Sequence, residues 1–139
     1  MFAPTVGLDT QPTTVAEQGT LAARGDAGAQ FGVGYSYWVG QRGLHEDAEA
    51  GRWFRLAADR GLAGAQYNLG YKYVTGQGVP QDDVQGHMWF NLAASRSTGE
   101  DRETAVRNRD IVAGRMDPTQ VAEARRLARE WDAAHPREP

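Results

Sequence analysis

The 139-residue sequence contains no cysteine and a single lysine, Lys72, beside 14 arginines. The absence of cysteine excludes disulfide bridges and metal sites built from thiolates. Because there is one lysine, a phosphate-binding P-loop or a Schiff-base lysine has no candidate elsewhere in the chain. No apolar run approaches the ~18 residues that a membrane-spanning helix needs, so we expect no membrane insertion.

A signal peptide and a strong net charge are also missing. The chain as given does not begin with a basic segment followed by an apolar core. The sequence leaves the location open between the cytoplasm and, if a signal has been removed, the periplasm or the outside of the cell. The formal net charge is −3, with 24% charged residues. Such a surface has no pronounced attraction for nucleic acids or anionic membranes, so we expect no nucleic-acid partner.

What the sequence does contain is an internal repeat with a period of 36 residues. Segment 28–58 aligns without a gap with segment 64–94, and 14 of 31 positions are identical. The identical positions include Trp53 and Trp89, and we expect both tryptophans in the core. A fixed period between about 20 and 50 residues is typical of solenoid proteins, in which each repeat packs mainly on its neighbours.

Apolar residues inside each repeat follow a helical period. In the first repeat Ala29, Val33 and Tyr37 recur every four residues, which indicates one buried stripe of a helix. Gly34 lies inside that helix, where glycine destabilises by roughly 1 kcal/mol relative to alanine, so we expect a close helix–helix approach there. The stripes and the turn signals between them predict two helices per repeat. These helices are expected over residues 27–39, 47–59, 63–75 and 83–95.

The remaining segments are interpreted as the ends of the array. Asp117, Pro118 and Gln120 form a helix-start signal, an N-cap followed by proline and by a capping-box residue. The helix after them carries an apolar stripe and is expected to cover the open end of the last repeat. The fold class is therefore all-α, an α/α superhelix (solenoid) of two 36-residue helix-turn-helix repeats. Its predicted parts are a flexible leader (1–13), an N-terminal half-repeat helix (14–25), repeat one (26–61), repeat two (62–97), C-terminal capping helices (98–135) and a tail (136–139).

The repeat resembles the Sel-one-like repeat (SLR) family, a relative of the tetratricopeptide arrays. The resemblance is carried in repeat two by Ala65, Leu69, Gly70, Tyr73, Gly76, Gln77, Gly78, Val79, Asp82, Trp89, Ala93 and Ala94. Repeat one departs from the pattern at its turn, where Arg42 stands at the position of Gly78. The resemblance implies paired antiparallel helices stacked as a right-handed superhelix, and a role as an adaptor in protein–protein interaction. Members of the family are often exported or associated with the cell envelope.

Aromatic residues on the first helix of each repeat form the candidate binding site. In such solenoids the first helix of each pair lines the concave face, and aromatic residues are favoured as interface anchors. The alternative is that the same side chains pack between adjacent repeats, because a first helix has neighbours on two sides. The candidate partner-binding residues are the aromatic side chains of Phe31, Tyr35, Trp38, Tyr67 and Tyr71, with Asn68 and Lys72 flanking them to supply polar contacts.

No catalytic, cofactor-binding or metal-binding constellation is recognised in the sequence. His45, His87 and His135 share no metal-ligand spacing, and we expect them on the solvated surface. Paired carboxylates such as Asp82 and Asp83 lie at helix starts, where negative charge complements the helix dipole. The serines lack the sequence context of known nucleophiles.

These observations favour a non-catalytic protein–protein interaction module, an adaptor or scaffold that binds a peptide or helix of a protein partner. The alternative is a cell-envelope ligand-binding protein or an enzyme acting on peptidoglycan-like material, although the chain lacks an evident nucleophile for that chemistry. A third hypothesis is a fragment of a longer array, because two full repeats are few for a stable solenoid.

Overall fold

The structure is a computed structural model that describes residues 15–39 and 46–137. Within these ranges the chain forms seven helices and no strand, which confirms the all-α prediction. The helices are α1 (Val15–Ala23), α2 (Ala27–Val39), α3 (Asp47–Asp59), α4 (Ala63–Thr75), α5 (Asp83–Ser95), α6 (Gly99–Ala113) and α7 (Pro118–Ala134). The four repeat helices begin and end at the residues expected from the sequence. The predicted leader, the turn of repeat one and the end of the tail lie outside the described residues.

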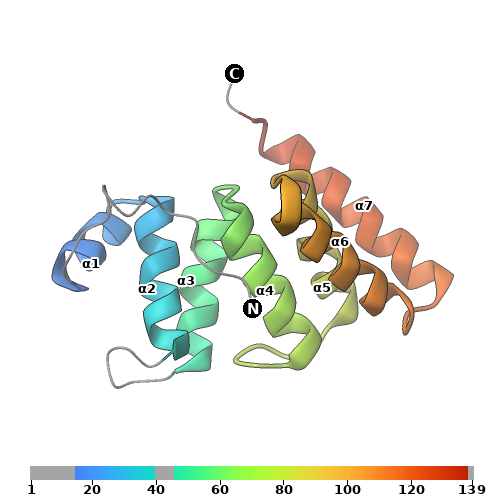
Figure 1. The fold of residues 1–139 in the computed structure, drawn as a ribbon, viewed down its shortest axis with the longest axis horizontal. Coiled ribbons are helices and arrows are strands. Elements are labelled where there is room, and N and C mark those ends of the chain that lie inside the picture. The colour runs from blue at the N-terminus through green and yellow to red at the C-terminus, as the bar shows by residue number, and fades with distance from the viewer. Residues whose placement is uncertain (1–14, 40–45, 138–139) are drawn as a thin grey trace.

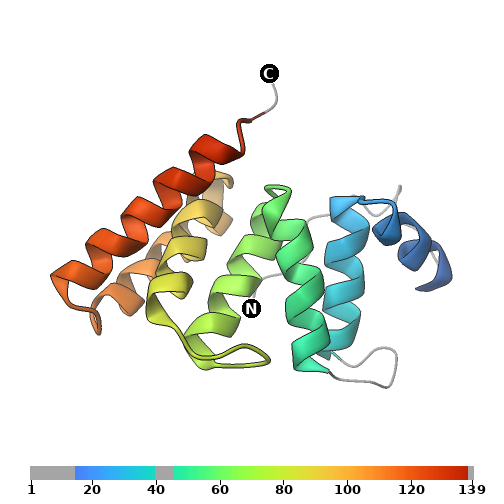
Figure 2. The same cartoon turned by 180° about the vertical axis from the view of Figure 1, so that it is seen from behind.

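The helices stack in a single row, with the first and second helices of the repeats on opposite sides. Figure 1 shows α2, α4 and α6 toward the viewer, and Figure 2 shows α3, α5 and α7 from behind. Each pair packs on itself, α2 on α3 and α4 on α5, while α3 also packs on α4 and joins the two repeats. Since α6 begins 36 residues after α4 (99 − 63), it continues the row of first helices.

Glycine allows the two helices of each repeat to approach closely. A Cβ atom placed on Gly34 would lie 2.9 Å from a ring carbon of Phe54. The equivalent atom on Gly70 would lie at the same distance, 2.9 Å, from a ring carbon of Phe90. The expected close approach is thus confirmed in both repeats, and the phenylalanine ring of the second helix fills the space that a side chain would need.

The core runs through both repeats and continues under the last two helices. Trp89 is fully buried in it, as expected. Its repeat equivalent Trp53 is only half-buried, because it lies near the N-terminal end of the row and packs on a smaller cluster that includes Val33. Both tryptophans were expected in the core, and the structure corrects this for Trp53, which is only partly buried against the second cluster. The largest buried side chains of the main core are Trp89, Phe31, Phe54, Lys72 and Phe90.

The last helix, α7, starts and packs as the sequence predicts. The Asp117 side chain accepts a hydrogen bond from the backbone N–H of Gln120 at 2.8 Å, and the Gln120 side chain accepts one from the Asp117 N–H at 2.9 Å. This capping box satisfies N–H groups that the first turn leaves free. Further along, Ala128 is buried and the Trp131 ring meets the Trp89 ring edge-on, at 6.0 Å between centroids. Both α6 and α7 pack against α5, so the pair covers the end of repeat two.

One histidine is buried under these capping helices, contrary to the expectation of a solvated surface. The side chain of His87 is 2% exposed, and its Nδ1 atom has no hydrogen-bond partner among the described residues. Burial lowers the pKa of His87, Arg109 and Arg125 lower it further, and Asp110 partly opposes them. His135 is half-buried and stacks on Trp131, with 3.9 Å between ring centroids. The third histidine lies outside the described residues.

We expect the free energy of unfolding to fall as the pH drops below about 6.5, the usual pKa of an exposed histidine. Because the folded state holds the pKa of His87 below that value, the unfolded state binds the proton more readily. The stability is complete above the unfolded pKa and is lost as the pH falls toward the folded one. Thermal melting of the wild type and His87→Gln across this range measures the effect. The Tm of the variant should fall less with decreasing pH than the Tm of the wild type. An identical dependence of Tm on pH would contradict a lowered pKa of His87 in the folded state.

Candidate functional site

Three aromatic side chains form a continuous row that crosses from repeat one to repeat two. Tyr35 and Trp38 of α2 meet edge-on, with 6.2 Å between ring centroids and 89° between the ring planes. The Trp38 ring then lies 6.1 Å from the ring of Tyr71 on α4. We call Tyr35, Trp38 and Tyr71 the aromatic row. Helix periodicity places the first two on one face, and the packing of the repeats adds the third.

Trp38, the central residue of the aromatic row, is fixed by contacts with buried side chains. The Trp38 ring packs edge-on against buried Phe54, 5.9 Å between centroids. Trp38 also contacts Lys72, whose ammonium lies 5.5 Å from the centre of the Trp38 ring, within range of a cation–π interaction. The same ammonium donates to the Gln77 carbonyl at 3.3 Å and lies 3.7 Å from an oxygen of Asp47. These contacts fix Trp38 at the junction of the two repeats.

Lys72 is therefore a structural residue rather than the flanking surface contact that the sequence suggested. Its side chain is 0% exposed. Burial lowers the pKa of Lys72, and the nearby Asp47 carboxylate acts in the opposite direction. Successive residues of a helix point about 100° apart, so Lys72 faces repeat one while its neighbour Tyr71 stays exposed.

Three more of the expected site residues are buried. Phe31 packs on Phe54 with 5.7 Å between ring centroids, and Asn68 is 0% exposed. Tyr67 is 8% exposed, because its ring packs on a phenylalanine of α5 and its hydroxyl accepts a hydrogen bond from Asn108 of α6 at 2.7 Å. These three side chains are therefore buried rather than accessible, but the ring contacts of Phe31 and Tyr67 lie within one repeat, whereas the Tyr67–Asn108 hydrogen bond reaches the next unit. The aromatic row does not continue onto Tyr67, since α6 covers that position.

The accessible part of the site is the aromatic row together with one residue that the sequence analysis did not include. Tyr71 is 38% exposed, and Tyr35 and Trp38 are half-buried. Val39 is 42% exposed and lies one helical turn after Tyr35, so the same four-residue spacing could have identified it. Half-buried aromatic rings on a rigid helical surface are suited to hold an apolar side chain of a partner.

Other kinds of site find little support in the part of the chain that the structure describes. No cluster of three potential metal-binding side chains is found there. Among the helices in the described ranges, none combines the length and the apolar character needed to cross a membrane. A pocket of about 220 Å³ lies between α5 and α7 near the C-terminal end of the described residues.

Comparisons with known proteins agree with this architecture. The chain is similar to the crystal structure of a protective antigen present in uropathogenic Escherichia coli strains, which displays an SLR fold, with a TM-score of 0.79 and 30% identity. That match covers 87% of this chain and only 25% of the antigen, so the chain spans a quarter of its length. A Sel1 repeat protein from Oxalobacter formigenes matches with a TM-score of 0.67 and 24% identity, covering 95% of this chain and 98% of that one. Among curated proteins no match is found.

The family assignment rests on the repeats themselves. The Sel1 repeat profile matches residues 27–62 and 63–97, which hold α2 with α3 and α4 with α5. Together these two segments cover more than half of the chain. Sel1 repeat proteins are generally protein-interaction modules, and their solenoid is typically a non-catalytic scaffold. By its repeats and by its fold, this chain belongs to the Sel1 repeat family.

Proposed function

We propose that the chain binds a peptide or helix of a protein partner on the face formed by α2 and α4, with the aromatic row as the anchor. The single observation that carries this proposal is the Tyr35–Trp38–Tyr71 contact, which places three accessible rings across the repeat boundary. A solenoid face of this kind is extended, so it suits a segment of polypeptide better than a compact small molecule.

The rigidity of the row favours binding. Ordering a loose side chain on association costs about 0.5–1.5 kcal/mol, and a ring that is already fixed avoids that cost. Trp38 is fixed by Phe54 beneath it and by the buried Lys72 beside it. Tyrosine and tryptophan are also the side chains most often found as interface hot spots.

The alternative function, ligand binding or catalysis on peptidoglycan-like material, gains no specific support from the described residues. Turnover of a muropeptide panel by the purified protein, abolished by one point mutation, would establish it in place of the proposed function.

The double substitution Tyr35→Ser and Tyr71→Ser should weaken partner binding by at least about 2 kcal/mol while leaving the helical content intact, since truncation of a hot-spot aromatic has about this effect. A partner peptide is first selected on wild-type protein from a phage-displayed library. Its Kd for each variant is then measured by calorimetry, with circular dichroism as the test of folding.

Ile111→Ser provides the matched control. Ile111 is 65% exposed on α6 and belongs to no part of the aromatic row, so its loss removes accessible apolar surface elsewhere. We expect this variant to bind the selected peptide like the wild type. Equal weakening by Ile111→Ser, or unchanged binding by the folded double variant, would place the interaction on another face.

A further inference from the structure

The structure assigns an oxyanion, a phosphate or carboxylate group, to the small pocket between α5 and α7. The pocket has a volume of about 220 Å³ and uses none of the aromatic-row residues. A space of this size has room for one such group together with water molecules. Its lining residues are Asn91, Leu92, Ser95, Arg125, Ala128, Arg129 and Asp132.

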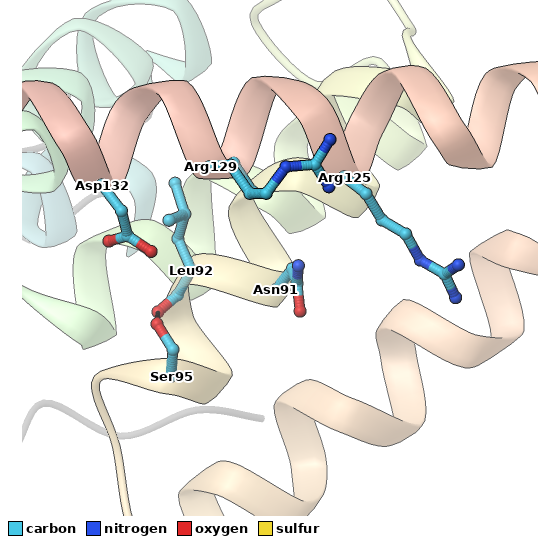
Figure 3. A pocket seen from close by; sticks show the side chains of 7 residues that line it. Asn91, Leu92, Ser95, Arg125, Arg129 and Asp132 are labelled. Atoms are coloured by element: carbon cyan, nitrogen blue, oxygen red, sulfur yellow. Dashed lines mark hydrogen bonds between the residues drawn. The ribbon is translucent and has the colours of Figure 1, made fainter.

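Two arginines supply the positive charge at one end of the pocket. Figure 3 shows Arg125 and Arg129 projecting from neighbouring turns of α7, with Arg129 running along the helix and Arg125 extending toward α6. Neither has a carboxylate partner within residues 15–39 and 46–137. Their neighbour Arg126, by contrast, is paired with both Glu123 and Glu130. The two pocket arginines therefore keep their donors available for a ligand, and guanidinium groups match the geometry of carboxylates and phosphates.

Asn91 adds a donor whose orientation is fixed by the protein. Its Oδ1 atom accepts a hydrogen bond from Arg109 of α6 at 3.0 Å. Because the oxygen is engaged in this way, the Nδ2 group remains as the donor that Asn91 can offer to a ligand. Figure 3 shows the Asn91 side chain reaching from α5 toward the arginines of α7. The pocket lining thus combines this neutral donor with the two arginines of α7, a set of groups suited to an oxyanion.

The one carboxylate in the lining does not cancel this charge. Asp132 lies at the opposite end of the pocket in Figure 3. It is paired with Arg96 at 3.3 Å, so its charge is already balanced. A second sign of the local positive potential comes from buried His87 on α5, whose pKa is lowered by both Arg109 and Arg125 in addition to burial.

The test uses the full chain with inorganic phosphate and with acetate as probes, at low ionic strength. Binding is followed by NMR through the Asn91 side-chain amide and the arginine Nε–H signals. We expect saturable shifts with a millimolar Kd, and binding weakened about tenfold or more by Arg125→Gln with Arg129→Gln, because two charge-assisted hydrogen bonds are lost. Arg126→Gln, a paired arginine on the same helix, is the matched control and should bind normally. Binding of phosphate alone assigns a tetrahedral dianion, and binding of both probes assigns carboxylate groups as well.

A second measurement needs no substitution. Saturating phosphate should raise the pKa of His87 in the wild type, because the bound anion offsets the charge of Arg125. The imidazole proton shifts report this pKa directly. Absence of saturable binding of either probe, equal weakening by Arg126→Gln, or an unchanged pKa of His87 in the presence of bound phosphate would each overturn the proposal.

Discussion

Trp89→Ala should lower the free energy of unfolding by about 3–5 kcal/mol, the range for truncation of a buried aromatic in a core. Trp89 is fully buried, its ring meets Trp131 of α7 edge-on, and the Arg55 guanidinium lies 5.5 Å from the ring centre. The substitution would leave a cavity at the joint between repeat two and its cap. For a chain of this length we expect a Tm lower by about 10–20 °C, measured by circular dichroism.

Trp53→Ala is the matched control, because Trp53 occupies the same position one repeat earlier. Its side chain is half-buried against the small N-terminal cluster rather than the main core. We expect a loss of about 1–2 kcal/mol there, since less apolar surface is removed from contact. An equal decrease in the free energy of unfolding for Trp53→Ala and Trp89→Ala would contradict the different burial of the two side chains.

Gly78→Ala should destabilise the protein by about 2–5 kcal/mol, the sum of a left-handed backbone strain of about 1–2 and an overpacking cost of about 1–3. Gly78 has a φ of +75°, and a Cβ atom placed there would lie 2.3 Å from the carbonyl carbon and oxygen of Asp47. The turn of repeat two thus packs closely against the start of α3 in repeat one. The preceding carbonyl, of Gln77, is also the acceptor for buried Lys72, so a displaced turn would remove that contact as well.

Gly99→Ala separates the two contributions to this effect. Gly99 also has a positive φ, +59°, but no atom lies within 4 Å of a Cβ placed there. This control should therefore lose about 1–2 kcal/mol, from backbone strain alone. Denaturant unfolding of both variants gives the comparison, and a Gly78→Ala variant as stable as Gly99→Ala would contradict close packing of the turn on repeat one.

The substitutions at Trp89 and Gly78 test stability, and those at Tyr35 and Tyr71 test binding, in different regions of the molecule. Trp89 and Gly78 hold neighbouring units together, at the cap and at the repeat junction. Tyr35 is half-buried and Tyr71 is exposed, so we expect their substitution to reduce stability less than substitution of Trp89 or Gly78. A partner that binds across Trp38 and Tyr71 would contact both repeats at once, and its affinity would then depend on the junction that Gly78 and Lys72 maintain.

The sequence by itself determined the helices and their repetition. The 36-residue period, the apolar stripes and the capping signals are local properties of the chain, and a helix begins and ends by local backbone and side-chain hydrogen bonds. The bounds of α2 through α5 and the start of α7 at Pro118 could be predicted for that reason. The close approach of the two helices at Gly34 and Gly70 could also be predicted. A residue that destabilises a helix but recurs at the same position in both repeats indicates that a larger side chain would not fit there.

Only the tertiary structure decided which side of each helix is covered. Periodicity shows which residues share a face, but it does not show whether a neighbouring helix lies on that face. Tyr67 is buried because α6 continues the row of first helices, while its helix neighbour Tyr71 stays exposed beyond that contact. Lys72 and His87 are buried by contacts between repeats and with the cap, where long-range packing outweighs the cost of removing polar side chains from water.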